Sequence, residues 1–104
     1  MVKRFDVYLL NMDDTPDAKD TRPCVVVSPN EINAHLESVI IAPVSSVTRK
    51  YPTRVPFDFL GNERTIVLDQ IQTVEKSRLT KKIGVVGREV EDSIVGTLLE
   101  IFAH

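Results

Sequence analysis

The sequence predicts a small, mainly β protein in which a twisted, largely antiparallel sheet is closed by one helix near the C-terminus. Two β-branched apolar runs, residues 23–28 and 38–44, support the sheet because such side chains suit a pleated, buried surface. With 104 residues the chain has room for one domain, 1–104. The helix is indicated by apolar residues at three- and four-residue spacings, which are Val90, Ile94, Thr97, Leu98, Ile101 and Phe102.

Further segments have the alternating or β-branched patterns of strands. Pro56 lacks an amide proton, so the strand that contains it belongs at a sheet edge. Asp69 interrupts an apolar run, so we expect one strand that is bent or bulged at this point. In order, the additional strands are expected at residues 4–10, 53–59, 64–68 joined to 70–74, and 82–86.

The connections between the strands are polar and carry turn residues. Residues 11–22 form a loop that is longer than most, which favours a functional or mobile segment. A short helix is expected at residues 30–36, with Ser28 or Asn30 as its cap. The other connections are a basic loop at 47–52 and turns at 60–63 and 75–79.

The composition, 42% hydrophobic and 27% charged, describes an ordinary globular protein. No segment approaches the roughly twenty apolar residues of a membrane span, and the start of the chain lacks the apolar stretch of a signal peptide, so we expect a cytoplasmic location. Cys24 is the single cysteine and lies in a Val-rich run, where a buried structural role is expected. The net charge of −2 leaves attraction to nucleic acid to local basic patches.

The residues able to do chemistry lie where apolar runs begin or end. Arg22 precedes one run while Ser45 and Ser46 follow another, and a guanidinium with paired hydroxyls can converge on a phosphodiester. Asp69 follows a third run, where a carboxylate needs a partner, which makes it a candidate base, a base-reading group or a structural partner. The sequence has neither a nucleotide-binding motif nor Cys/His pairs at metal spacing, so no metal or cofactor is expected.

Four stretches, taken in chain order, carry a family pattern. They are K-R-F-D-V-Y at 3–8, T-R-P-C-V-V-V-S at 21–28, I-A-P-V-S-S at 41–46 and L-D-Q-I-Q-T-V-E-K-S-R-L at 68–79. The last is the most specific, because it is similar to L-[DE]-Q-I-R-T-[IV]-D-K-x-R-L. Over nearly its whole length the chain therefore resembles the MazF/PemK family of toxin endoribonucleases.

This resemblance implies a fold, an activity and partners. The fold would be an SH3-like twisted barrel of the CcdB/Kid/MazF type with a C-terminal amphipathic helix, assembled as a homodimer. The activity would be metal-independent cleavage of single-stranded RNA, which leaves a 2′,3′-cyclic phosphate and a 5′-hydroxyl. An acidic, MazE-like antitoxin would neutralise the toxin.

The resemblance also implies roles for individual residues. Arg22 stands at the family's essential Arg, and Ser45 stands where the family usually has an essential Thr. Asp69 and Gln70 match positions that touch RNA bases. The residues expected near the rim of the same groove are Arg4, Ser46, Tyr51 and Pro52.

The chain departs from the family pattern near the expected site. Phe5 replaces a common Gly, Asp14 a common Pro and Gln72 a common Arg, and the loop before Arg22 is about two residues shorter, with Asp17 as its nearest carboxylate. Arginine stays protonated to above roughly pH 12. We therefore expect the arginine to stabilise the phosphorane and donate a proton. The proton of the 2′-hydroxyl would pass to Asp69, Asp17 or a bound water.

Two hypotheses from other functional classes stay open. A CcdB-like protein traps DNA gyrase without cutting RNA, but that family binds through a C-terminal Trp-Gly-Ile, whereas this chain ends in Phe-Ala-His and has no Trp. A catalytically silent relative would only bind its acidic partner, which the altered loop favours. Incubation with RNA in EDTA separates these readings from an endoribonuclease.

Overall fold

The computed structural model describes residues 1–12 and 20–103. Within this part of the chain it contains seven strands, two α-helices and two short 3-10 helices. In order, the elements are β1 (Asp6–Asn11), β2 (Thr21–Val26), α1 (Asn30–His35), β3 (Ser38–Ser45), β4 (Arg54–Phe59), β5 (Asn62–Val67), η1 (Leu68–Gln70), β6 (Gln72–Glu75), η2 (Lys76–Arg78), β7 (Leu79–Val85) and α2 (Arg88–Phe102).

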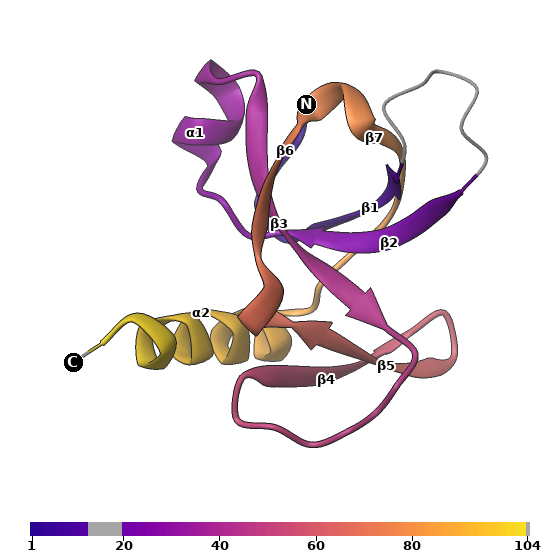
Figure 1. Ribbon diagram of the computed structural model, residues 1–104, viewed down its shortest axis with the longest axis vertical. Helices are drawn as coiled ribbons and strands as arrows, with labels where there is room; N and C mark the ends of the chain where they lie inside the picture. The colour runs from indigo at the N-terminus through magenta and orange to yellow at the C-terminus, as the bar shows by residue number, and fades with distance from the viewer. Residues whose placement is uncertain (13–19, 104) are drawn as a thin grey trace.

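The described strands pair antiparallel in the order β4-β5-β3-β2-β1-β7, and β6 pairs with β3 as well. Strand β3 organises this sheet, because its first half pairs with β6, its middle with β2 and its end with β5. Since η2 joins β6 to β7, the sheet curls into a nearly closed ring, with the β4–β5 hairpin and α2 beneath it (Figure 1). The expected mainly β fold with a C-terminal helix is therefore confirmed.

The apolar runs of β2 and β3 are continuous because both faces of the sheet are buried. Val25 lies on one face and Cys24 and Val26 on the other, as the alternation of a strand requires. The core on the α2 side, here the helix-side core, consists of Val7, Val25, Val27, Ala42, Val55, Phe57, Ile66, Leu68, Val86 and Ile94. The second core, on the other face, consists of Leu10, Cys24, Val26, Val39, Ile41 and Val74.

The bend expected at Asp69 is confirmed, but it divides the strand in two. Val44 of β3 is opposite Ile66 of β5, whereas Ile40 of β3 is opposite Thr73 of β6. The register therefore shifts by three residues between the two pairings, and these three residues form η1. The carboxylate of Asp69 thus lies on a short helical turn rather than inside a strand.

The C-terminal helix matches the expected amphipathic pattern except at its last residue. Ile94 is fully buried, and Val90, Leu98 and Ile101 pack against the same core. Phe102 was expected on this face, but it is 69% exposed. The reason is geometric, because eight residues at about 100° each place Phe102 roughly 80° around the helix from Ile94. No helix in the described part of the chain is long and apolar enough to cross a membrane.

Helix α1 forms where expected, but without the expected cap. Its N-cap is Pro29, and neither Ser28 nor Asn30 caps it with a side chain. The Ser28 hydroxyl instead donates to Asn33 Oδ1 and accepts the backbone N–H of Ile40 at 3.0 Å. These buried bonds tie the start of α1 to β3.

Other strand ends also differ from the expected ranges. The first strand begins at Asp6 because Phe5 has a left-handed backbone, with φ at 72°. Two hydrogen bonds hold this conformation, from Phe5 N to the Val26 carbonyl at 2.6 Å and from Val86 N to the Phe5 carbonyl at 3.0 Å. The last strand begins at Leu79, three residues before the expected start, because η2 is only one turn long.

Candidate functional site

Arg22 lies near the start of β2 with its side chain directed to solvent. The side chain is 68% exposed, and its Nε is 3.3 Å from Oδ1 of Asp20. Exposed ion pairs of this kind are worth about 0–1 kcal/mol. A phosphate can therefore displace Asp20 from the guanidinium at little cost.

Ser45 is the last residue of β3, and its hydroxyl is oriented by the backbone. The N–H of Val47 donates to Ser45 Oγ at 3.0 Å, which fixes the oxygen and leaves the hydroxyl proton for a ligand. A threonine at this position would be restrained by its methyl group. In this chain the hydrogen bond from Val47 supplies part of that restraint.

Arg22 and Ser45 flank the point where β2 and β3 part, which we call the strand fork. Pairing between these strands ends at Cys24 and Pro43, after which β2 stays with β1 and β3 continues with β5 (Figure 1). Each of the two predicted catalytic residues lies two positions beyond this last pair. Alternation along a strand therefore directs both side chains to the face that carries Cys24 and the second core.

A second group of predicted residues meets around Arg54, the first residue of β4. The guanidinium carbon of Arg54 lies 4.7 Å from the centre of the Tyr51 ring, and its Nε lies 3.5 Å from Asp69 Oδ1. The Arg54 Nε is buried and has no aligned hydrogen bond, so its contact with the carboxylate is an ion pair only. We call Tyr51, Arg54 and Asp69 the Arg54 cluster.

The sequence alone did not assign Arg54 to the site. Arg54 comes shortly after the basic loop 47–52, and a cation in such a place usually faces solvent. What identifies Arg54 as a site residue is its contact with Asp69, which forms only on folding because Asp69 is 15 positions further along the chain. The other predicted contact residues, Ser46, Pro52 and Gln70, are exposed and lie next to fork or cluster residues in the chain.

The strand register relates the fork to the cluster. Ser45 is opposite Thr65, and Thr65 is opposite Pro56 on the far side of β5. Arg54 is two positions from Pro56, so its side chain is on the same face as that of Ser45. Strand spacing and rise give a separation of roughly 12 Å along the sheet. Asp69, which pairs with Arg54, therefore belongs to the cluster and not to the fork.

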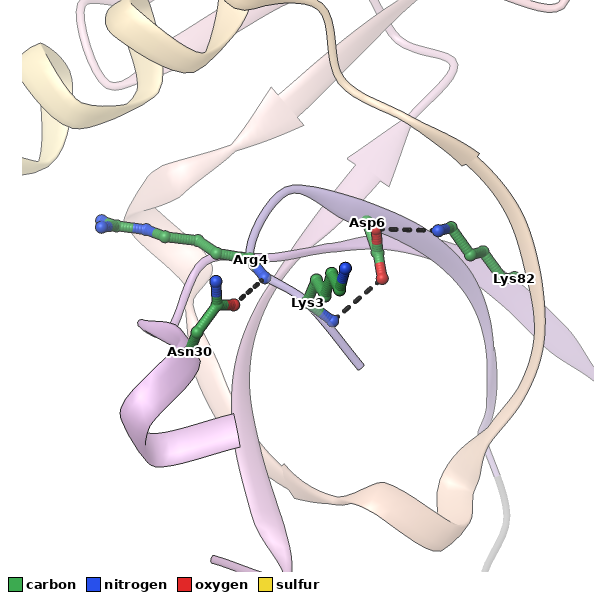
Figure 2. Close-up of polar contacts among 5 residues, drawn as sticks. All are labelled: Lys3, Arg4, Asp6, Asn30 and Lys82. Atoms are coloured by element: carbon green, nitrogen blue, oxygen red, sulfur yellow. Dashed lines mark hydrogen bonds and ion pairs between the residues drawn. The ribbon is translucent and has the colours of Figure 1, made fainter. Parts of the chain in front are cut away.

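Arg4 lies elsewhere, beside α2 (Figure 2). Its backbone N–H donates to Asn30 Oδ1 at 2.8 Å, while its side chain points away from Asn30 and stacks 5.0 Å from the Phe5 ring. The structure thus does not bring Arg4 into the Arg54 cluster. Arg4 lines a groove of about 340 Å³, together with Val95, Leu98, Leu99, Phe102 and Ala103.

Figure 2 also shows a buried carboxylate that supports the start of β1. Asp6 is 3% exposed and accepts the N–H of Lys3 at 2.9 Å. Its other oxygen, Oδ1, is 3.2 Å from Lys82 Nζ on β7. The amino group of Lys82 is therefore paired with Asp6 and links β7 to the start of β1.

Asp17, the other predicted acid or base, lies outside the described residues. The ends of its segment are held together, because Met12 N donates to the Asp20 carbonyl at 3.0 Å. Arg78 of η2 donates from Nε to the Asn11 carbonyl at 2.9 Å. Arg78 therefore anchors the end of β1 near Arg22.

Cys24 has the structural role expected of it. Burial raises the pKa of its thiol to about 12, so it is protonated and unreactive at neutral pH. A larger hollow of about 670 Å³ is remote from the fork and contains none of the predicted site residues. It is lined by Ala34, His35, Leu36, Glu37, Ser38, Glu75, Lys76 and Ser77.

These features define a small, curled β protein whose exposed arginine is placed at a strand fork. Over residues 3–102 the chain matches the family described as PemK-like, MazF-like toxin of type II toxin-antitoxin system. It is similar to Endoribonuclease EndoA of Bacillus subtilis, with 32% identity over 102 residues that cover 90% of this chain and 88% of that protein. The chain therefore belongs to the PemK/MazF toxin family and to its class of toxin endoribonucleases, as the sequence motifs predicted.

Solved structures match the fold over nearly the full chain. An endoribonuclease in complex with its cognate antitoxin, from Mycobacterial species, superposes with a TM-score of 0.83 at 23% identity, covering 96% of this chain and 93% of that one. A MazE-MazF complex from Deinococcus radiodurans gives a TM-score of 0.83 at 21% identity, covering 98% and 95%. The expected MazF-type architecture is thereby confirmed.

Proposed function

We propose that this chain cleaves single-stranded RNA without a metal ion and leaves 2′,3′-cyclic phosphate and 5′-hydroxyl ends. The observation that carries the proposal is the strand fork, where an exposed guanidinium and an oriented hydroxyl are directed to one face. The proposal assigns this activity to the single domain formed by residues 1–104. As the toxin of a toxin-antitoxin pair, the protein would act on messenger RNA in the cytoplasm.

The reaction needs little from the protein beyond binding and charge stabilisation. The RNA supplies the nucleophile, since its 2′-oxygen attacks the neighbouring phosphorus and the bond from phosphorus to the 5′-oxygen breaks. One proton leaves the 2′-hydroxyl and one joins the 5′-oxygen, so no water is consumed. The protein must hold the phosphate in line and stabilise the negative charge of the phosphorane.

Arg22 and Ser45 suit these two tasks. A planar guanidinium can donate to two phosphate oxygens at once, which favours the phosphorane over the ground state. The Ser45 hydroxyl donates a further hydrogen bond to the same group. Arg22 can also supply a proton to the leaving 5′-oxygen, because an alkoxide is a stronger base than a neutral guanidine, and the side chain then regains a proton from water.

The position of Asp69 supports a role in RNA binding rather than in proton transfer. Its carboxylate is paired with Arg54, and the register puts this pair roughly 12 Å from Ser45. In the proposed mechanism the 2′ proton passes to a bound water or to Asp17, which is in the segment before Arg22. Gln70, Tyr51, Pro52 and Ser46 would contact the RNA on either side of the cut.

Two protein partners belong to the proposal. An acidic antitoxin of the MazE type would neutralise the toxin, and the similar mycobacterial and Deinococcus proteins are described as complexes with an antitoxin or MazE. A second copy of the chain would form a homodimer. Leu99 and Phe102, which are 67% and 69% exposed on α2, provide apolar surface for such an association.

The decisive experiment is to incubate the pure protein with mixed-sequence RNA in EDTA and to map the new ends. We expect fragments with cyclic phosphate and 5′-hydroxyl ends from the wild type, and a loss of roughly 100-fold or more for Arg22→Ala. Arg49→Ala, which removes another exposed cation, is the matched control and should retain most activity. Failure of the wild type to cut, or unchanged cutting by Arg22→Ala, would overturn the proposal.

A further inference from the structure

Arg54 connects two segments that the sequence keeps apart, the loop before β4 and the turn η1. Its guanidinium stacks on the Tyr51 ring and pairs with the Asp69 carboxylate. Its backbone N–H also donates to the Tyr51 carbonyl at 3.0 Å. Because the Arg54 side chain is only 21% exposed, it fixes the ring and the carboxylate relative to each other.

Both neighbours of Arg54 keep a binding surface open. Tyr51 is 46% exposed, so the part of its ring that the guanidinium does not cover can accept a second flat group. The Asp69 side chain is 39% exposed and meets Arg54 through Oδ1. Among the described residues, Oδ2 of this carboxylate has no hydrogen-bond donor, so it is open to a ligand.

An aromatic ring beside a hydrogen-bond acceptor is what an unstacked RNA base requires. We propose that Tyr51, Arg54 and Asp69 form a subsite for one RNA base that carries an exocyclic amino group. The base stacks on Tyr51 and donates an amino hydrogen to Asp69, as cytosine, adenine and guanine can do. Uracil has no exocyclic amino group, so the subsite discriminates against it.

Arg54 is a positioning residue in this subsite, because it acts through Tyr51 and Asp69. A guanidinium suits this role since one planar group can stack on a ring and pair with a carboxylate. Methionine keeps a comparable apolar stem but loses the charge and the plane. Lysine keeps the charge alone, so it should restore the position of Asp69 but not the stacking on Tyr51.

The position of the subsite fits an RNA strand that also reaches the fork. Arg54 and Ser45 are on the same face of the β3–β5–β4 sheet, roughly 12 Å apart. A strand whose phosphate lies at Arg22 can therefore place a neighbouring base at Tyr51. The choice of RNA as the ligand rests on the proposed function, but recognition of the base does not require cleavage.

The test measures binding of RNA that cannot be cut. Four fluorescent 2′-O-methyl hexanucleotides, oligo(C), oligo(A), oligo(G) and oligo(U), are titrated with the full-length protein and followed by anisotropy. For the wild type we expect the best-bound of the three amino-bearing oligomers to bind at least fivefold more tightly than oligo(U). Arg54→Met should reduce this ratio below twofold, and Arg54→Lys should give an intermediate ratio.

Two further variants make the outcome decisive. Arg49→Met removes an exposed cation near Tyr51 in the sequence, so it should change binding of all four oligomers by one small, common factor and leave their ratio as in the wild type. Asp69→Asn changes an exposed side chain, and its amide can donate to uracil O4, so it should raise the relative affinity for oligo(U) even if Arg54→Met folds poorly. Equal binding of oligo(U) by the wild type, or a ratio unchanged in both Arg54→Met and Asp69→Asn, would overturn the base subsite.

The two proposals fail in different ways. Base discrimination without cleavage of RNA in EDTA would overturn the proposed reaction and support the subsite. Cleavage that depends on Arg22, together with equal binding of the four oligomers, would support the reaction and overturn the subsite.

Discussion

The strand fork and the Arg54 cluster each contain an arginine at the start of a strand, but the two arginines are held differently. Arg22 has a side chain that is 68% exposed and, among the residues that the structure describes, meets one exposed carboxylate, that of Asp20. Arg54 is 21% exposed and is enclosed by a ring and a carboxylate. The same residue type therefore has two roles, which its surroundings decide. Arg22 is available to a phosphate, whereas Arg54 positions its neighbours.

This difference has a cause in the sheet. At the fork β3 no longer pairs with β2, so Arg22 has a strand neighbour only on the β1 side, and its side chain is exposed. At the start of β4, by contrast, Leu68 N donates to the Thr53 carbonyl at 3.2 Å, which brings η1 and the loop before β4 together around Arg54. The same sheet thus offers one open and one packed site for a guanidinium.

The largest effect that would test this contrast is expected for Arg22→Lys. Lysine keeps the charge but lacks the planar fork that can donate to two phosphate oxygens. We expect kcat for RNA cleavage to fall by roughly 100-fold, close to the loss for Arg22→Ala. The melting temperature should not change, because the side chain is exposed. Retention of a third or more of the activity would show that charge alone is sufficient at the fork.

A smaller effect is expected for the hydroxyl beside it. Ser45→Ala removes one donor and should lower kcat by roughly tenfold to 100-fold. Ser45→Thr keeps the hydroxyl and adds a methyl that restrains its rotation, so activity should equal or exceed that of the wild type. Single-turnover cleavage of one short RNA measures both variants. Equal rates for the alanine and threonine variants would exclude the hydroxyl from the reaction.

The face beneath the fork can be examined through Cys24, two residues from Arg22. Burial raises the pKa of its thiol from 9.0 to about 12. Below pH 9 the thiol is neutral in both the folded and the unfolded chain, so its contribution to stability is complete. Above pH 9 the unfolded chain loses this proton first, and stability falls as the pH rises towards 12.

The size of this effect can be measured at pH 10. One pH unit above the unfolded pKa, the thiol should lower the free energy of unfolding by about 1 kcal/mol relative to pH 8. Urea unfolding of the wild type and of Cys24→Ala at both pH values isolates this contribution, because the variant has no thiol. An equal change with pH in the two proteins would show that the strand beneath Arg22 is open to water.

The sequence predicted best what depends on local pattern. The β-branched runs located β2 and β3, and the three- and four-residue spacing located α2, because burial on one or both faces imposes these periods. The resemblance in short motifs predicted the family and the MazF-type fold. Each of these inferences uses residues that are close together in the chain.

The sequence predicted least well what depends on which strands become neighbours. Arg54 resembled a solvated cation, because its partner Asp69 comes close only when η1 folds back on β4. The sequence also does not predict the shift of three residues in the pairing register at η1, since both halves of the expected strand carry the same alternation. Phe102 fits the apolar spacing of α2, yet the sheet does not extend far enough around the helix to cover it.

The smallest expected effect concerns Asp20, the exposed carboxylate that pairs with Arg22. Asp20→Asn removes the partner of Arg22 without touching Arg54, so RNA should bind roughly threefold more tightly at low salt. The gain should fade at higher ionic strength, because exposed charges are screened within about 8–10 Å at physiological salt. Anisotropy titrations of an uncleavable RNA at two salt concentrations measure this change. Asp58→Asn, which removes an exposed acidic charge from β4, is the matched control. If both variants gain equally, the effect is one of net charge, and Asp20 does not compete with phosphate for Arg22.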